Sequence, residues 1–285
     1  KAEKCTMCYP RLEVGQPTVC SETCVGRLRY LGLVLYDADR VAEAATEPDE
    51  TKLMAAQKSI LLDPRDPEVL AEARRSGIPE DWLEAAQNSP VYDLACRYDV
   101  ALPLHPEYRT LPMVWYIPPL SPVVDALTET GHDGEDIGNL FGAIDAMRIP
   151  IEYLAELFTA GDIDPVNDVL RKLAAMRSHM RTVNLGEAVD PSIAEAVGMT
   201  IAEMESMYRL LAIAKYEDRY VIPSAHTEVA NALLEELPGC SVDFTSTNGD
   251  SPVGEAKPVP VTIESFQLTK QRLEAEQYSD LDHKQ

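Results

Sequence analysis

Four cysteines within the first 24 residues carry the clearest chemistry in this sequence. They follow the pattern Cys5-x2-Cys8-x11-Cys20-x3-Cys24. Thiolates bind soft metals, and four of them can hold either a tetrahedral zinc ion or an iron–sulfur cluster. The spacing alone leaves both kinds of site open. A zinc site made by all four cysteines would give a stabilised scaffold or assembly module without a redox role.

The gap from Cys20 to Cys24 favours two sites over one. In the run C-x2-C-x2-C-x3-C of two-cluster ferredoxins, the fourth cysteine ligates the other cluster. By this logic Cys5, Cys8 and Cys20 hold one cluster and Cys24 a second. This sequence departs from that run in its longer second gap and in Val25, which stands where the run has proline. Neither cluster is complete here, so we expect the missing ligands upstream.

The remaining two of the six cysteines stand alone. A disulfide scaffold spreads its cysteines through a small secreted domain, whereas clustering at one end favours metal ligation in a reducing compartment. Cys96, beside Leu94 and Ala95, is predicted to be a small buried helical residue. Cys240 is not counted among the ligands.

Net charge excludes some partners. The 285 residues include 48 acidic and 25 basic ones, a formal net charge of −23. Such a chain repels nucleic-acid phosphates and anionic lipid headgroups, so we expect no nucleic-acid partner and no polybasic membrane patch. No apolar run reaches the ~18 residues of a transmembrane helix. The sequence does not begin with Met and its first residues lack an apolar signal-peptide core, so we expect a chain that begins inside a larger protein.

Helix signals dominate after residue 37. Asp66-Pro67, Asp164-Pro165 and Asp190-Pro191 each place an N-cap acid before a proline, and Thr200 with Glu203 fits a capping box. Tyr30 to Tyr36 is a strand candidate. Helices are predicted near 38–46, 50–60, 67–76, 79–88, 90–98, 122–130, 150–160, 165–182, 191–197, 201–217 and 226–236. In the tail, a strand at 259–263 and a helix at 265–276 are predicted.

Two further features suggest interactions. The apolar segment Leu111–Val124 contains four prolines and Trp115, which suits either a preformed surface for a partner subunit or burial in this chain's own core. Arg11, Arg27 and Arg29 lie near the ligand cysteines in sequence. A cation there would favour a reduced, more negative cluster, although a surface or subunit-pairing role is the alternative.

Several long segments resemble the beta subunit of respiratory nitrate reductases. Residues 3–39, EKCTMCYPRLEVGQPTVCSETCVGRLRYLGLVLYDAD, resemble the last cysteine group of that family and the segment after it. Residues 102–122 (LPLHPEYRTLPMVWYIPPLSP), 148–162 (RIPIEYLAELFTAGD) and 208–224 (YRLLAIAKYEDRYVIPS) resemble the same family. The resemblance runs from residue 3 to about 240, in order, and the tail beyond matches poorly.

The resemblance implies a mainly α fold. An irregular cysteine-bearing segment, 1–36, would be the last part of a ferredoxin-like 4Fe-4S domain. A helical C-terminal domain, 37–245, and a polar tail, 246–285, would follow it. The resemblance agrees with the ferredoxin logic on ligands. Cys5, Cys8 and Cys20 would join one upstream cysteine on one [4Fe-4S] cluster, and Cys24 would join three upstream cysteines on another.

The resemblance also implies a function. Such a subunit, part of a quinol-dependent nitrate reductase, carries electrons from a haem b membrane gamma subunit to a molybdenum-containing alpha subunit that reduces nitrate. It would lie peripherally at the cytoplasmic face of the bacterial cell membrane and hold no nitrate-reducing site itself. A [3Fe-4S] cluster and a further [4Fe-4S] cluster would be held by the missing N-terminal part. A beta subunit of a related molybdenum enzyme, such as a nitrite oxidoreductase, is the nearest alternative.

Overall fold

The computed structural model describes residues 5–120, 122–124, 141–144, 146–147 and 149–223. The described residues belong to one compact unit, residues 1–227. Several predictions lie outside the described residues: most of the helix at 122–130, the helix at 226–236, Cys240, the strand at 259–263, the helix at 265–276 and the tail 246–285.

The cysteine-bearing segment folds into two short helices that lead into a strand. Helix α1 spans Tyr9–Glu13 with Pro10 in its first turn, where a missing N–H costs nothing. Gly15 follows with φ of +78°, a conformation that glycine adopts without strain. Helix α2 (Val19–Glu22) is a single turn. The proline- and glycine-rich loop therefore doubles the chain back between Cys8 and Cys20.

The strand predicted at Tyr30–Tyr36 is two strands in different sheets. Strand β1 (Arg29–Tyr30) pairs antiparallel with β4 (Trp115–Tyr116), and β2 (Leu35–Tyr36) pairs antiparallel with β3 (Leu61–Leu62). Between them the chain passes so close to Ser89 that a Cβ on Gly32 would lie 2.3 Å from its Oγ. This close approach turns the chain from one strand partner to the other.

The first run of predicted helices is confirmed with small shifts of their ends. Asp66 caps α5 by accepting the N–H of Glu68, with Pro67 at the first helical position, as the sequence predicted. Gly77 ends α5 with φ of +80°. The elements from 38 to 108 are η1 (Ala38–Arg40), α3 (Val41–Ala45), η2 (Glu50–Lys52), α4 (Leu53–Ser59), α5 (Pro67–Arg75), α6 (Glu80–Asn88), α7 (Pro90–Tyr92), the π-helical η3 (Asp93–Arg97) and η4 (Pro106–Tyr108).

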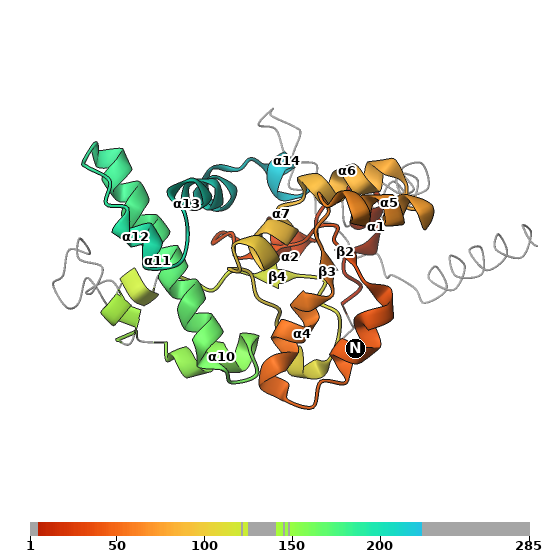
Figure 1. Cartoon of the computed structure of the whole chain (residues 1–285), viewed down its shortest axis with the longest axis horizontal. Helices are drawn as coiled ribbons and strands as arrows, with labels where there is room; N and C mark the ends of the chain where they lie inside the picture. The colour runs from red at the N-terminus through yellow and green to blue at the C-terminus, as the bar shows by residue number, and fades with distance from the viewer. Residues whose placement is uncertain (1–4, 121, 125–140, 145, 148, 224–285) are drawn as a thin grey trace, which may run out of the picture. The chain divides into compact units, whose positions relative to one another are not determined.

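The second run contains the longest described helix, α11 (Ile163–Leu185), shown in green in Figure 1. The sequence predicted Asp164 as its N-cap, but the N-cap is Asp162. The Asp162 carboxylate accepts the Asp164 N–H. Pro165 is tolerated inside the first turn, where backbone N–H groups have no helical partner. Helix α10 (Ile151–Phe158) and α13 (Ile201–Tyr208) both contact α11.

Two predictions in this run need correction. The helix predicted at 191–197 is the shorter α12 (Ser192–Glu195), although Asp190 accepts the Ser192 N–H as a cap should. The helix predicted at 201–217 is broken. Its first half is α13, with the Thr200–Glu203 capping box intact.

The break in that helix has a visible cause. After α13 come the π-helical η5 (Arg209–Ile213), an extended Ala214 (φ −48°, ψ 134°) and a separate turn, α14 (Tyr216–Arg219). The Arg27 Nη1 donates to the carbonyls of Ala212 and Ala214 at 3.0 and 3.4 Å. A distant arginine therefore satisfies carbonyls that a continuing helix would have used.

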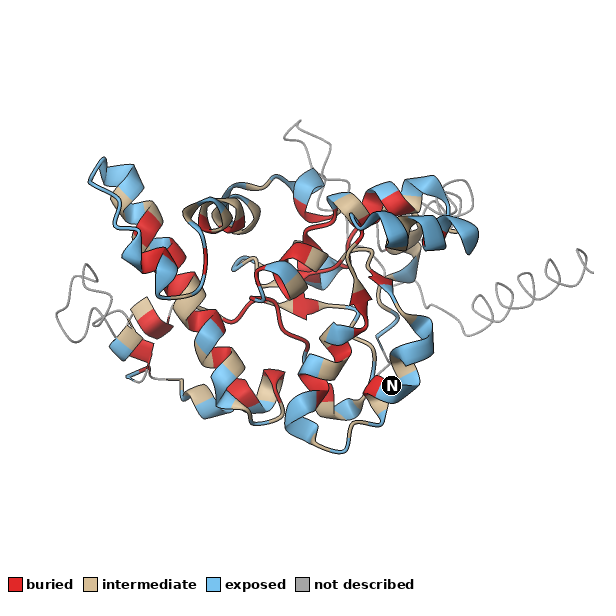
Figure 2. Ribbon diagram, in the orientation of Figure 1, coloured by how far each residue is buried: buried red, intermediate tan, exposed pale blue. Residues whose placement is uncertain are grey.

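Trp115 lies in the core. It is 1% exposed, in one apolar cluster with Tyr30 and the buried residues of α11. Figure 2 shows this burial on the central strands and along α11. Of the two roles left open for this segment, burial in the chain's own core therefore holds for Trp115. Exposed apolar side chains of the same region are Tyr108 and Met113.

The mainly α fold class is confirmed: in the described residues, helices form most of the structure, beside two two-stranded sheets. Within the same residues, no helix combines the length and the apolar character needed to cross a bilayer.

Candidate metal centre

The four predicted ligand cysteines lie around the two short N-terminal helices. Cys5 precedes α1, Cys8 is its N-cap, Cys20 lies within α2 and Cys24 follows it. All four are free thiols. Cys5 and Cys20 are exposed, and Cys8 and Cys24 are half-buried. Their sulfur atoms are thus available to a metal at the surface of the described part of the chain.

Three of these sulfur atoms already have hydrogen-bonding groups aimed at them. The Met7 N–H lies 3.4 Å from Cys5 Sγ, and the Leu28 N–H lies 3.4 Å from Cys24 Sγ. The Thr18 Oγ1 lies 3.4 Å from Cys20 Sγ. Hydrogen bonds to cysteine sulfur stabilise the thiolate and tune the reduction potential of a cluster. The Thr18 hydroxyl donates its hydrogen to Ser21 Oγ at 2.9 Å, so the backbone N–H groups of Met7 and Leu28 are the donors that fit a thiolate-bound iron–sulfur group.

The turn between Cys5 and Cys8 is strained. Met7 and Cys8 have consecutive positive φ values of 58° and 51°. A residue other than glycine in this left-handed region costs roughly 1–3 kcal/mol, and such residues gather at functional sites. The two left-handed residues turn the chain sharply between Cys5 and Cys8.

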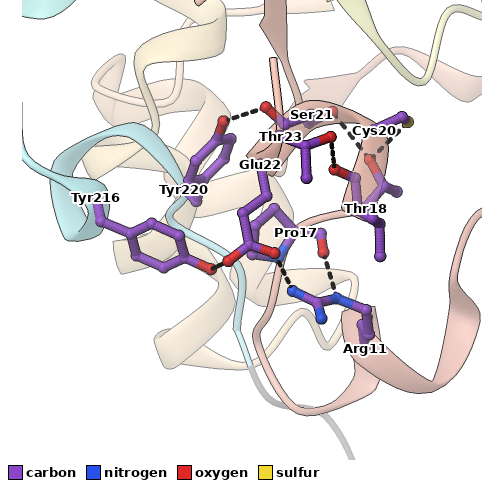
Figure 3. A network of polar contacts seen from close by, with 10 residues as sticks. Arg11, Pro17, Thr18, Cys20, Ser21, Glu22, Thr23, Tyr216 and Tyr220 are labelled. Atoms are coloured by element: carbon purple, nitrogen blue, oxygen red, sulfur yellow. Dashed lines mark hydrogen bonds and ion pairs between the residues drawn. The ribbon is translucent and has the colours of Figure 1, made fainter. Parts of the chain in front are cut away.

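A polar network braces the loop between Cys8 and Cys20 (Figure 3). The buried Arg11 donates to the Pro17 carbonyl at 2.9 Å and forms an ion pair with Glu22. The Glu22 carboxylate also accepts the Tyr216 hydroxyl at 3.2 Å. Burial, reinforced by Glu22, raises the pKa of Tyr216 to about 12. The phenol is therefore protonated at neutral pH and donates to the carboxylate.

Tyr116 on β4 pairs with Arg29 on β1, the strand that follows the cysteine segment. The pKa of Tyr116 is raised by burial, and negative charge at Cys20 and Cys24 adds to the shift, while Arg29 opposes it. The Arg29 guanidinium lies 5.9 Å from the Tyr116 ring centre and donates to the Cys20 carbonyl at 3.2 Å. The β1–β4 pairing thus places the half-buried Tyr116 beside Arg29, which itself binds the backbone of a predicted ligand.

The three arginines near the cysteines all have protein partners. Arg11 binds Pro17 and Glu22, Arg27 binds carbonyls after α13, and Arg29 binds the Cys20 carbonyl. Each has a structural task. The idea that one of them raises a cluster potential stays a prediction, tested by the potential after neutralising Arg27.

No closed metal site is formed by the described residues alone. Among them, no group of three or more His, Cys, Asp or Glu side chains is arranged to hold a metal ion.

Comparison with known families covers the cysteine segment and the helical region separately. The family model described as "4Fe-4S dicluster domain" matches residues 1–34, and "Respiratory nitrate reductase beta C-terminal" matches residues 120–201. Similar proteins agree. The nitrate reductase beta chain of Bacillus subtilis (strain 168) is 55% identical over 251 residues, which is 87% of this chain and 51% of the relative. The chain belongs to the respiratory nitrate reductase beta family.

Two further relatives of the beta family support this. The respiratory nitrate reductase 2 beta chain of Escherichia coli (strain K12) is 52% identical over 244 residues, 86% of this chain and 47% of the relative. The respiratory nitrate reductase beta chain of a Bradyrhizobium species is 43% identical over 224 residues, 78% of this chain and 66% of the relative. The chain spans about half the length of the first two relatives.

Several residues that contact the cysteine segment of this beta-family chain could not be predicted from its sequence. Glu22, Tyr216 and Tyr220 were not predicted to act there, because 194 and 199 residues separate the tyrosines from their partners. The one available signal was the resemblance of the segment 208–224 to the family. His105 lies outside this network. Its Nδ1 is 2.7 Å from Glu107 Oε1, a hydrogen bond typical of a structural histidine.

Cys96 is chemically distinct from the four clustered cysteines. It is half-buried in η3, less buried than predicted, and burial raises the pKa of its thiol to about 11 from an ordinary 9.0. Because the thiolate is the reactive form, its alkylation by iodoacetamide at pH 8 should be about a hundredfold slower than that of an ordinary thiol. The rate should rise about tenfold per pH unit up to about pH 10.

The rate of Cys96 alkylation is measured by mass spectrometry of the peptide that contains Cys96, with the unfolded protein as control. Equal rates in the native and unfolded protein at pH 8 would show that burial does not suppress this thiol.

Proposed function

We propose that this chain is part of the iron–sulfur electron-transfer subunit of a membrane-associated respiratory nitrate reductase. The observation that carries the proposal is the coincidence of two features in one segment. The "4Fe-4S dicluster domain" match covers residues 1–34, and in the same segment hydrogen-bonding groups meet the sulfurs of Cys5, Cys20 and Cys24. The names of the relatives supply nitrate as the electron acceptor.

The four cysteines are assigned to two clusters. Cys5, Cys8 and Cys20 supply three ligands of one [4Fe-4S] cluster, and Cys24 supplies one ligand of a second. The spacing x3 before Cys24 supports this division, as it does in two-cluster ferredoxins. The remaining ligands, a [3Fe-4S] cluster and a further [4Fe-4S] cluster are assigned to the length of the relatives that this sequence does not cover.

The residues of this chain position the clusters and tune them. A bound iron–sulfur cluster supplies one-electron transfer without proton transfer, so no residue here acts as acid, base or nucleophile. The N–H groups of Met7 and Leu28 stabilise negative charge on sulfur. The Arg29 guanidinium donates to the Cys20 carbonyl and so helps to fix the backbone at that ligand. Burial and hydrogen bonding are the two means by which a protein sets a cluster potential.

The partners follow from the same proposal. A haem b gamma subunit in the membrane would supply electrons, and a molybdenum-containing alpha subunit would take them for anaerobic nitrate respiration. The subunit would lie peripherally at the cytoplasmic face of the membrane. The exposure of Cys5 and Cys20 in the described part of the chain supports the proposal that further ligands come from outside it.

Rapid mixing of the assembled complex tests the proposal. Clusters reduced with a quinol should be reoxidised when nitrate is added, at a rate at least equal to steady-state turnover. Buffer without nitrate is the control and should leave the clusters reduced. Clusters that stay reduced in nitrate, while the complex turns over, would place them outside the electron path and refute the proposal.

A further inference from the structure

Helix α14 and the residue after it, Tyr220, contact the short helix α2, which contains Cys20 and is followed by Cys24. The Tyr220 hydroxyl donates to the Ser21 carbonyl at 2.7 Å, and the Tyr216 hydroxyl donates to the Glu22 carboxylate at 3.2 Å (Figure 3). Ser21 and Glu22 lie between the two cysteines. Both bonds therefore act on the backbone or side chain of the residues that join Cys20 to Cys24.

The two tyrosines are themselves fixed. Their rings meet edge to face, with centres 5.1 Å apart. The buried Arg219 lies 4.9 Å from the Tyr220 ring centre and 5.8 Å from that of Tyr30, and its Nη2 donates to the Tyr220 hydroxyl oxygen at 3.0 Å. Because the Tyr220 oxygen accepts from Arg219, its own hydrogen is free to point at Ser21.

Arg27 of the cysteine segment adds two hydrogen bonds to the same contact. Arg27, three residues after Cys24, donates to the carbonyls of Ala212 and Ala214. The cysteine segment and the segment 212–220 therefore hold each other at several points, although about 190 residues separate them in sequence. We call Tyr216, Arg219 and Tyr220 the tyrosine clamp.

Helix α2 needs such support. It has four residues, and a single helical turn is not stable in isolation because nucleation costs more than its few bonds return. Cys20 is also exposed, so the sulfur has little packing of its own. The position of the sulfur therefore depends on what holds the backbone of α2.

We infer that Tyr216 and Tyr220 are positioning residues that fix helix α2, and with it the sulfurs of Cys20 and Cys24, for cluster binding. This inference rests on the proposed function, in which Cys20 and Cys24 serve different clusters. Helix α2 then bridges two redox centres, and the clamp keeps the two ligand positions constant relative to each other. The C-terminal segment thus contributes to cluster retention without supplying a ligand.

The test uses the double variant Tyr216→Phe/Tyr220→Phe in the full-length protein within its complex. Both rings remain, and only the two hydroxyl bonds are lost. Because each such bond shifts a local equilibrium by about fivefold, anaerobic iron release to a chelator should accelerate at least about fivefold. The electron paramagnetic resonance spectrum of the two reduced clusters should also change. Tyr153→Phe, at a tyrosine that is 58% exposed on α10, should change neither.

A second control separates positioning from general stability. Leu170 is fully buried in α11, so Leu170→Ala should lower the melting temperature more than the double variant does. The inference predicts that Leu170→Ala nevertheless releases iron more slowly than the double variant well below melting. Iron release and resonance spectra that match the wild type in the double variant would overturn the inference and leave the proposed function standing. A wild-type protein without acid-labile sulfide would overturn both.

Discussion

Cys24→Ala and Cys8→Ala, each made in the full-length protein, are expected to remove different clusters. Each variant should lose about four iron atoms per chain, because each cysteine serves its own [4Fe-4S] cluster. The two variants should lose different signals in the electron paramagnetic resonance spectrum. The double variant should lose about eight iron atoms, the sum of the single effects.

Cys96→Ala is the matched control for these variants. It removes a half-buried cysteine outside the cluster segment and should keep all iron. If Cys8 and Cys24 instead share one site, the two single variants lose the same metal and the double variant loses no more than either. That result would refute the division of ligands at the x3 gap.

Trp115→Ala is expected to have the largest effect on folding. The side chain is 1% exposed in the main core, and truncating a buried tryptophan costs about 3–5 kcal/mol. For a folded unit of this size, the loss lowers the melting temperature by about 10 °C. The measurement is the thermal loss of the helical circular-dichroism signal in the purified protein.

The control for Trp115 is Tyr108→Ala, at the end of the short helix η4 that precedes this segment. Tyr108 is 69% exposed, so its truncation should change stability by less than about 0.5 kcal/mol. The folded fraction of Trp115→Ala should still assemble with its partners. Unchanged melting together with lost assembly would return Trp115 to the interface role that the structure rejects.

Local signals predicted most of the helices in the described part of the chain. Asp66-Pro67 and the Thr200–Glu203 capping box act as predicted, because a cap depends on residues two or three positions away. The prediction failed where the chain meets distant segments. The helix at 201–217 breaks at Ala214 where Arg27 binds its carbonyls, and no local pattern contains that contact.

In the candidate site, too, local features could be predicted from the sequence and contacts between distant segments could not. The spacing of Cys5, Cys8, Cys20 and Cys24 predicts the ligand residues, since thiolate chemistry is local to the motif, and this assignment stays a prediction. The tyrosines that hold α2 could not be predicted, because Tyr220 reaches Ser21 across 199 residues. Trp115 was assigned two roles for a similar reason, since a proline-rich apolar segment suits a surface or a core until its pairing with β1 is known.

Metal analysis of the full-length native protein, purified without oxygen, tests the central claim most directly. The quantities are iron, acid-labile sulfide and zinc per chain. The account predicts iron and sulfide in near-equal amounts, well above about four per chain, with little zinc. One zinc per chain and no labile sulfide would contradict electron transfer and support a zinc-stabilised scaffold.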